Sequence, residues 1–156
     1  MIHHISIPAE NPQHVAEVIA KIWGGRSFPF PDHPGNYLVV TLDSYGTMIE
    51  VYALGTELVP GTDEQPVEFG HNNTPAQFSA SHAAISVPVS FEQIKQIAES
   101  EGWRLVRCDR GPFEVIEFWL ENRQLIELLA PEIAPQYINF MQPQNLQEFF
   151  AVVGAA

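Results

Sequence analysis

The first residues of the chain alternate polar and apolar side chains in the manner of a half-buried strand. Within residues 2–8, the apolar Ile5 and Ile7 alternate with His4 and Ser6, which is the period of two that a strand requires. An Asn-Pro pair then supplies an N-cap and a proline at the first helical position. Apolar residues follow at helical spacing until a Gly-Gly pair ends the run. The pattern predicts a strand followed by an amphipathic helix.

The same pattern recurs from residue 81 onward, which indicates an internal repeat. Residues 81–88 alternate again, Ser90 is a candidate N-cap, and a helical stripe ends at Gly102. Each copy continues with strand-like runs, although the short, proline-flanked run at 27–30 favours an edge or irregular strand. The other predicted strands are residues 37–42 and 47–54 in the first copy and 104–108, 113–120 and 124–129 in the second.

The repeat divides the chain into four parts. We predict an α+β fold made of two tandem βαβββ modules, residues 1–56 and 81–131. Residues 57–80 lack periodicity and contain several prolines and asparagines, which predicts a linker. This linker is long for a passive connection, so we expect it also to cover a site or a partner surface. Residues 132–156 form a tail in which we expect one short amphipathic helix at 143–153.

Four polar residues stand out on the predicted strands. Glu50 and Glu127 lie within apolar runs on the last strand of each copy, where burial of an ionised carboxylate costs several kcal/mol unless it is compensated. His4 and His82 lie on the first strand of each copy, and the His-to-Glu interval differs by one residue between the copies. Each residue alone has a structural explanation, but the matched set favours a mixed nitrogen and oxygen site for a divalent metal.

Other candidate residues carry weaker signals. Arg107 is a candidate anchor for an anionic substrate, with a surface ion pair as the alternative interpretation. His3 has the opposite strand parity to His4 and is expected on the helix side. His71 could gate a site from the linker or be a solvated loop residue, and Cys108 is expected to be a structural thiol.

Composition narrows the classes of function. The chain has 46% hydrophobic and 17% charged residues, as globular proteins do, and a net charge of −12. That charge opposes binding to nucleic acid and to an anionic membrane surface. The N-terminus does not read as a signal peptide, the apolar runs are too short to span a bilayer, and a single cysteine excludes an intrachain disulfide. We therefore expect a cytoplasmic protein that binds a small-molecule substrate, which is neutral, cationic or held through a metal.

Several segments resemble the vicinal oxygen chelate superfamily, which includes glyoxalase I, extradiol dioxygenases, fosfomycin-resistance enzymes and bleomycin-resistance proteins. These segments are HHISIPAEN, a helix ending in WGG, TMIEVY and QLIELLAP, and the resemblance covers about residues 2–131. It implies two βαβββ modules that form a curled mixed β-sheet cup with flanking helices. It also implies one divalent metal ion (Ni, Zn, Co, Mn or Fe) held by His4, His82, Glu50 and Glu127. Relatives build this site within one chain or across a dimer, and we expect a homodimer.

The resemblance favours a glyoxalase-like lyase or isomerase whose substrate chelates the metal through vicinal oxygens. Glu127 or Glu50 would then be the general base and therefore a catalytic residue. An extradiol-type dioxygenase is one alternative, but such iron sites use a single carboxylate, and here Glu50 takes a fourth position. Another alternative is a metal-free protein of the bleomycin-resistance type that sequesters a cationic drug. Its groove would be lined by aromatic residues drawn from Trp23, Phe28, Phe30, Phe118 and Trp119. A metal site with a purely structural role is the last alternative.

Overall fold

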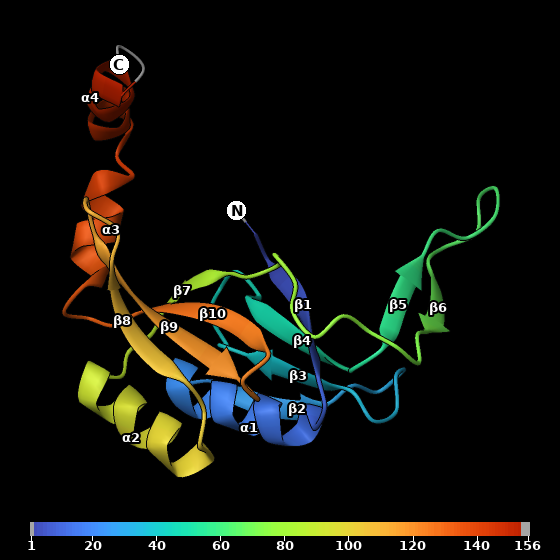
Figure 1. Ribbon diagram of the computed structural model, residues 1–156. Helices are drawn as coiled ribbons and strands as arrows, with labels where there is room; N and C mark the ends of the chain where they lie inside the picture. The colour runs from blue at the N-terminus through green and yellow to red at the C-terminus, as the bar shows by residue number, and fades with distance from the viewer. Residues whose placement is uncertain (1, 154–156) are drawn as a thin grey trace. The chain divides into compact units, whose positions relative to one another are not determined.

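The structure is a computed structural model that describes residues 2–153. The chain divides into two compact units. The first comprises Met1–Ser81 with Leu120–Gln124, and the second comprises His82–Trp119 with Leu125–Ala156. Figure 1 labels the elements of both units. Within the described part of the chain, no helix has the length and apolar character needed to cross a membrane.

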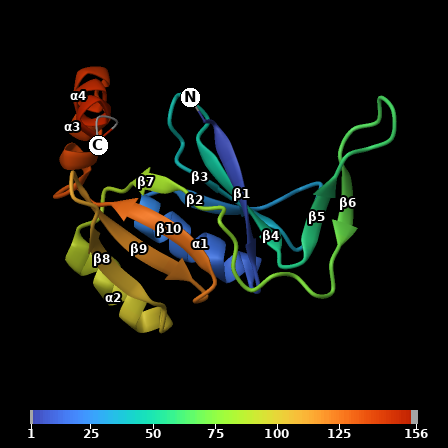
Figure 2. The same ribbon diagram turned by 45° about the horizontal axis from the view of Figure 1, so that its top comes forward.

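The first unit is a βαβββ module followed by a hairpin. Its four-stranded sheet has the order β1-β4-β3-β2, with β1 parallel to β4 and the other neighbours antiparallel. The hairpin β5–β6 forms a separate two-stranded sheet (Figures 1 and 2). The elements are β1 (His4–Ala9), α1 (Pro12–Trp23), β2 (Arg26–Pro29), β3 (Tyr37–Val40), β4 (Met48–Ala53), β5 (Thr56–Val59) and β6 (Glu68–His71).

Helix α1 covers one face of this sheet. The Asn11 side chain accepts a hydrogen bond from the His14 N–H at 3.2 Å, and Gly24 ends the helix in a left-handed conformation that glycine adopts without steric cost. The helix buries an apolar stripe, and the sheet residues Val39, Ile49 and Val51 are fully buried in the same core. Since side chains alternate along a strand, the residues between them lie on the opposite face.

A turn from the end of the chain's second repeat also belongs to the first unit. The Glu121 carboxylate accepts hydrogen bonds from the backbone N–H groups of Glu10 at 2.6 Å and Asn11 at 2.8 Å. Arg123 forms an ion pair with Glu10 at 3.4 Å. These contacts satisfy backbone donors at the junction between β1 and α1.

The second unit repeats the βαβββ arrangement with the sheet order β7-β10-β9-β8. Strands β7 and β10 are parallel, and β8 and β9 are antiparallel. Helix α2 begins with a reciprocal Ser90–Gln93 capping box and ends at the left-handed Gly102. The elements are β7 (Ala84–Ser86), α2 (Phe91–Glu101), β8 (Leu105–Asp109), β9 (Glu114–Leu120), β10 (Gln124–Leu129), α3 (Ala134–Phe140) and α4 (Pro143–Val153).

The fold class expected from the sequence is confirmed, with two local corrections. The segment predicted to be a linker, residues 57–80, contains most of β5 and all of β6, and its apolar Leu58, Val59 and Phe69 lie on these paired strands. The tail contains two helices instead of one. Phe140 of α3 packs against Phe113 at 5.4 Å and against Phe149 of α4 at 5.2 Å between ring centroids. These aromatic contacts favour helix in a segment whose own periodicity was weak.

The turn between β3 and β4 provides a test of the first unit's stability. Asp43 accepts hydrogen bonds from the backbone N–H groups of Tyr45 at 2.9 Å and Thr47 at 3.1 Å, and from the Thr47 hydroxyl at 2.6 Å. The Thr47 hydroxyl and N–H lower the pKa of Asp43 from 3.8 to about 2.

We expect Asp43→Ala to lower the urea midpoint of unfolding at pH 7. Because the pKa is depressed in the folded state, the stabilisation by Asp43 is complete above pH 3.8 and is lost as the pH falls toward about 2. The difference between wild type and variant should therefore shrink over that interval in urea titrations. A difference at pH 2 equal to that at pH 7 would contradict the assignment.

Candidate functional site

The first predicted His–Glu pair lies on the sheet of the first unit. Ser6 is the register partner of Glu50 on the parallel strands β1 and β4, and His4 precedes Ser6 by two residues, so all three share the face opposite α1. The His4 Nε2 and Glu50 Oε1 atoms are 4.0 Å apart. The Glu50 side chain is 12% exposed and that of His4 is 50% exposed, so the carboxylate is largely withdrawn from solvent while the imidazole is accessible.

Two hydroxyl groups hold the Glu50 carboxylate. The Ser6 hydroxyl donates a hydrogen bond to Oε2 at 2.7 Å, and the Tyr52 hydroxyl also bonds to Glu50. Burial, the charge of Glu50 and this hydrogen bond together raise the pKa of Tyr52 to about 12. Tyr52 is therefore a neutral donor throughout the physiological range. The Glu50 carboxylate is therefore held by uncharged groups, and its Oε1 atom faces His4.

The second pair repeats this geometry in the second unit. The register partner of Glu127 is Ala84, and His82 precedes Ala84 by two residues, just as His4 precedes Ser6. The His82 Nε2 and Glu127 Oε2 atoms are 4.0 Å apart, and the side chains are 45% and 14% exposed. The distances and exposures match those of the first pair closely. His4 and Glu50 lie on strands as the alternation predicted, whereas His82 lies two residues before β7 and is not on the strand predicted for residues 81–88.

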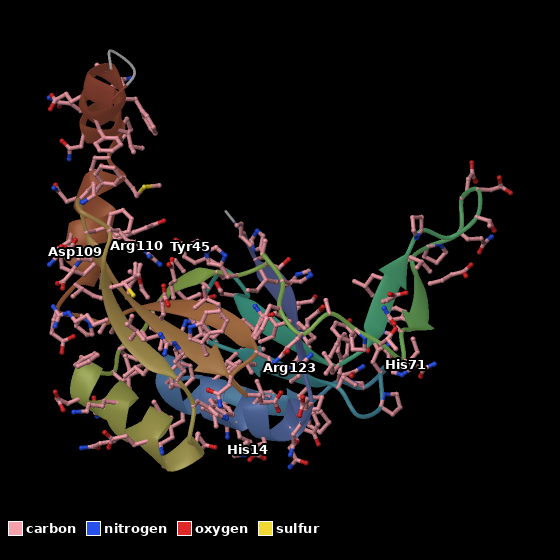
Figure 3. The ribbon with its side chains drawn as sticks, viewed as in Figure 1. His14, Tyr45, His71, Asp109, Arg110 and Arg123 are labelled. Atoms are coloured by element: carbon pink, nitrogen blue, oxygen red, sulfur yellow. The ribbon has the colours of Figure 1, made fainter. Side chains whose placement is uncertain are left out.

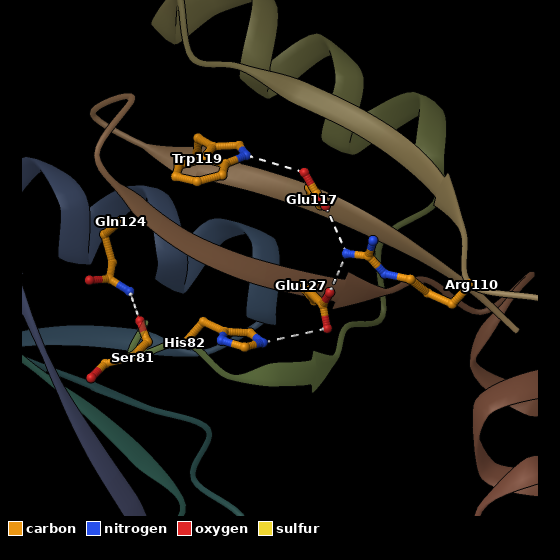
Figure 4. A network of polar contacts seen from close by, with 7 residues as sticks. All are labelled: Ser81, His82, Arg110, Glu117, Trp119, Gln124 and Glu127. Atoms are coloured by element: carbon orange, nitrogen blue, oxygen red, sulfur yellow. Dashed lines mark hydrogen bonds and ion pairs between the residues drawn. The ribbon is translucent and has the colours of Figure 1, made fainter. Parts of the chain in front are cut away.

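A guanidinium group compensates the second carboxylate. Arg110 donates from one nitrogen to Glu117 at 2.7 Å and to Glu127 at 2.9 Å, while Trp119 Nε1 donates to Glu117 at 3.5 Å (Figure 4). Burial opposes ionisation of Glu117, but the hydrogen bonds led by that from Arg110 lower its pKa. Hydrogen bonds to Glu127 and Glu117 raise the pKa of Arg110, so Arg110 and Glu117 form a charged pair at neutral pH.

The two pairs therefore differ in charge although their geometry is the same. Glu50 interacts with the neutral donors Ser6 and Tyr52, whereas Glu127 shares a full positive charge with Glu117. At the position of Ser6 the second unit has Ala84, which carries no hydroxyl group. Consequently the carboxylate of the first pair is bound only by uncharged donors, whereas that of the second pair already contacts the positive charge of Arg110.

Each pair fits the chemistry of a divalent metal. An imidazole nitrogen and a carboxylate oxygen 4.0 Å apart can be bridged by one ion, since bonds of about 2.1 Å to each would span the gap. In Glu127 the two contacts use different oxygens, since Arg110 bonds to Oε1 and His82 faces Oε2. Among the described residues, no group of three or more His, Cys, Asp or Glu side chains is placed to hold a metal. The structure thus supplies two matched donor pairs.

The remaining candidates lie elsewhere in their units. Arg107 forms an ion pair with Glu114 at 2.6 Å, which is the alternative expected from the sequence, and its register partner is Ile116 on the face opposite Glu117. The Nδ1–H of His3 donates to the Tyr45 carbonyl at 2.7 Å. His71 ends strand β6, where it pairs with Thr56 (Figure 3).

The aromatic residues expected to line a groove differ in their exposure to solvent. Phe118 is a fully buried core residue, whereas Phe28 is 42% exposed. Phe28 pairs with Leu38, which in turn pairs with Glu50, so Phe28 lies on the same sheet face as that carboxylate.

Sequence reasoning missed the groups that compensate the two carboxylates. Ser6 could have been found from its strand parity, since it follows His4 by two residues on an alternating strand. Tyr52 has the same relation to Glu50. Arg110 lies in a turn beyond β8, where strand periodicity gives no information on the direction of its side chain.

We expect Arg110→Met to raise the pKa of Glu117, because it removes the leading hydrogen bond that favours the ionised carboxylate. Carbon-13 NMR titration of side-chain carboxyl groups would measure it. Arg107→Met is the matched control, since its partner is Glu114 and Glu117 should titrate as in wild type. An unchanged Glu117 titration in Arg110→Met would contradict the network.

Comparisons with known proteins bear on the fold. No protein-family model and no curated protein sequence matches the chain. Among solved structures, the genomically encoded fosfomycin resistance protein FosX of Listeria monocytogenes matches with a TM-score of 0.54 at 11% identity, over 83% of this chain and 92% of that one. FosX of Mesorhizobium loti matches with a TM-score of 0.51 at 10% identity, over 82% and 88%.

A further FosX structure from Listeria monocytogenes contains Mn(II) and dihydroxypropylphosphonic acid. It matches with a TM-score of 0.52 at 12% identity, over 82% of this chain and 87% of that one. At such identities the likeness concerns the fold. Both units of this chain have the strand order of a βαβββ module, and the chain matches the fold of these structures. The chain therefore has the same fold as these fosfomycin resistance proteins, which is the fold that its sequence resemblance to the vicinal oxygen chelate superfamily implies.

Proposed function

We propose that the protein is a glyoxalase-like metal-dependent enzyme, a lyase or isomerase, that acts on a small substrate with two vicinal oxygens. The observation that carries the proposal is the pair of matched His–Glu sets, each with donor atoms 4.0 Å apart at corresponding positions of the repeat. We infer that His4, Glu50, His82 and Glu127 together hold one divalent ion. This inference depends on the chemical equivalence of the two sets and on the fold shared with Mn(II)-containing FosX.

The residues of the chain would perform distinct tasks in such a reaction. When bound, a divalent ion supplies Lewis acidity to the substrate oxygens that it contacts. His4 and His82 are about half-exposed, and their Nε2 atoms would be the nitrogen ligands of the ion. A glutamate then accepts a proton from the substrate carbon and returns it to a neighbouring position.

A second candidate function is metal-free binding of a cationic small molecule, as in bleomycin-resistance proteins. The specific observation in its favour is the ion pair between Arg110 and Glu127 at 2.9 Å, which compensates a ligand-type carboxylate without any metal. The net charge of −12 and the exposed Phe28 suit a cationic, apolar ligand.

We also propose that the protein is a homodimer. Helices α3 and α4 carry three large apolar side chains that are at least 38% exposed, namely Ile138, Phe149 and Phe150, and Met141 at the end of α3 is 44% exposed. Exposed apolar side chains concentrated on two short helices are typical of a surface that associates.

Metal analysis separates the two candidate functions. For the enzyme, protein purified without a metal-chelating column should contain close to one equivalent of Ni, Zn, Co, Mn or Fe. Glu50→Gln and Glu127→Gln should each lower metal affinity roughly tenfold or more and abolish turnover of α-ketoaldehydes, hemithioacetals or catechols. Glu68→Gln, an exposed strand glutamate, is the matched control. Full metal content and turnover in both site variants would refute the proposal, and metal-free protein that binds bleomycin would support the second candidate.

The dimer can be tested through its apolar surface. Ile138→Asp combined with Phe150→Asp should raise the dimer dissociation constant roughly tenfold or more, because charges would enter an apolar contact. Sedimentation velocity over a dilution series measures it, with Val67→Asp in the β5–β6 hairpin as the control for an added charge. Wild-type protein that is monomeric at all concentrations would exclude the dimer.

A further inference from the structure

A cavity in the first unit lies beside Glu50. It has a volume of about 190 Å³ and is lined by Ser6, Ile7 and Pro8 of β1, Tyr52 of β4, and Thr56 and Leu58 of β5. Two of these residues, Ser6 and Tyr52, are those whose hydroxyl groups bond to Glu50. The cavity therefore adjoins the carboxylate of the first His–Glu pair through the side chains that hold it.

One wall of the cavity belongs to the β5–β6 hairpin, which is anchored to the rest of its unit. The Phe69 ring lies 4.2 Å from that of His33 and 5.9 Å from that of Tyr52 between centroids. Gly55 adopts a φ of +93° at the start of the hairpin, and its carbonyl accepts the Asn72 N–H at 2.7 Å. Through these contacts, the hairpin holds Thr56, the last residue of the predicted first module, and Leu58, in the predicted linker, at a defined position.

The residues that line the cavity determine which kind of ligand it can bind. None of the described residues that line the cavity is charged, and the carboxylate beside it is that of Glu50. An anion would lack a positive partner here and would approach a negative charge in a partly buried site. Hydroxyl groups of Ser6, Tyr52 and Thr56 can instead bond to a neutral hydroxyl or carbonyl group, while Pro8 and Leu58 offer apolar contact.

We propose that this cavity binds the organic part of an uncharged small molecule that carries vicinal oxygens, and that Thr56 and Ser6 determine its specificity. The proposal deepens the proposed function and in part rests on it, since Glu50 would act on the molecule held there. Under this proposal, the β5–β6 hairpin contributes to the choice of ligand. It also separates this chain's ligand from the phosphonic acid found with FosX, because the lining offers no cation to such a group.

Binding to metal-free protein tests the cavity apart from catalysis. The probes are mandelamide and mandelate, which have the same size, the same aryl group and the same vicinal oxygens but differ in charge. In the presence of a chelator, methyl NMR of Thr56 and Leu58 should report saturable binding of mandelamide at least fivefold tighter than of mandelate. Equal or tighter binding of mandelate, or no saturable shift of these methyl signals with mandelamide, would overturn the proposal.

Variants locate the binding. Thr56→Val should weaken mandelamide binding at least threefold by removing a hydroxyl without a change in shape, and Ser6→Ala should do the same. Thr56→Ser keeps a hydroxyl group and should bind mandelamide with an affinity close to that of wild type. This comparison separates loss of the hydroxyl group from misfolding of the hairpin. Thr62→Val, in the same hairpin but outside the lining, is the matched control. Unchanged affinity in both Thr56→Val and Ser6→Ala would also overturn the proposal.

The two proposals fail in different ways. If the protein holds no metal and turns nothing over, yet mandelamide binds as described, the proposed reaction is wrong and the cavity assignment stands. If metal-dependent turnover is observed with the same kcat/KM in wild type, Ser6→Ala and Thr56→Val, the reaction stands and the cavity assignment is wrong.

Discussion

The placement of an ionised carboxylate in the middle of a β-sheet constrains the rest of each unit. Glu50 and Glu127 are 12% and 14% exposed, and such burial is unfavourable unless donors surround the oxygens. The strand alternation fixes which residues can provide them, because only side chains of the same parity reach the same face. The polar groups on this face of each sheet are therefore explained by their relation to one glutamate.

The two units meet this constraint with different chemistry. In the first, the hydroxyl groups of Ser6 and Tyr52 stabilise the carboxylate without reducing its charge. In the second, Arg110 bridges Glu117 and Glu127 and forms an ion pair with each. The two halves of the repeat thus share a geometry but differ in the charge around the carboxylate. They should therefore differ in their affinity for a cation. That inequality is the main departure from the symmetric picture drawn from the sequence.

The sequence predicted the strand positions that depend on alternating side chains and the helix ends that depend on local capping. The strand positions of His4 and Glu50 follow from alternation, and the register then sets Ser6 opposite Glu50, with His4 two residues from Ser6 on the same face. The helix boundaries at Asn11 and Gly24 follow from local capping chemistry. The hairpin strands were not predicted, because β5 and β6 are short and Phe69 is stabilised by rings distant in sequence, those of His33 and Tyr52. The direction of the Arg110 side chain could not be predicted either. Arg110 lies in a turn, where side chains do not alternate between two faces.

The contacts of Glu121 have a consequence for how the chain is synthesised. The backbone N–H groups of Glu10 and Asn11 are satisfied by a carboxylate more than a hundred positions later in the sequence. A ribosome therefore releases the first βαβββ repeat before the residue that completes the junction of β1 and α1 has been translated. The nascent repeat must keep those donors hydrated until the β9–β10 turn emerges. The tandem halves are thus repeats by pattern, but the first reaches its final hydrogen bonding only when most of the chain exists.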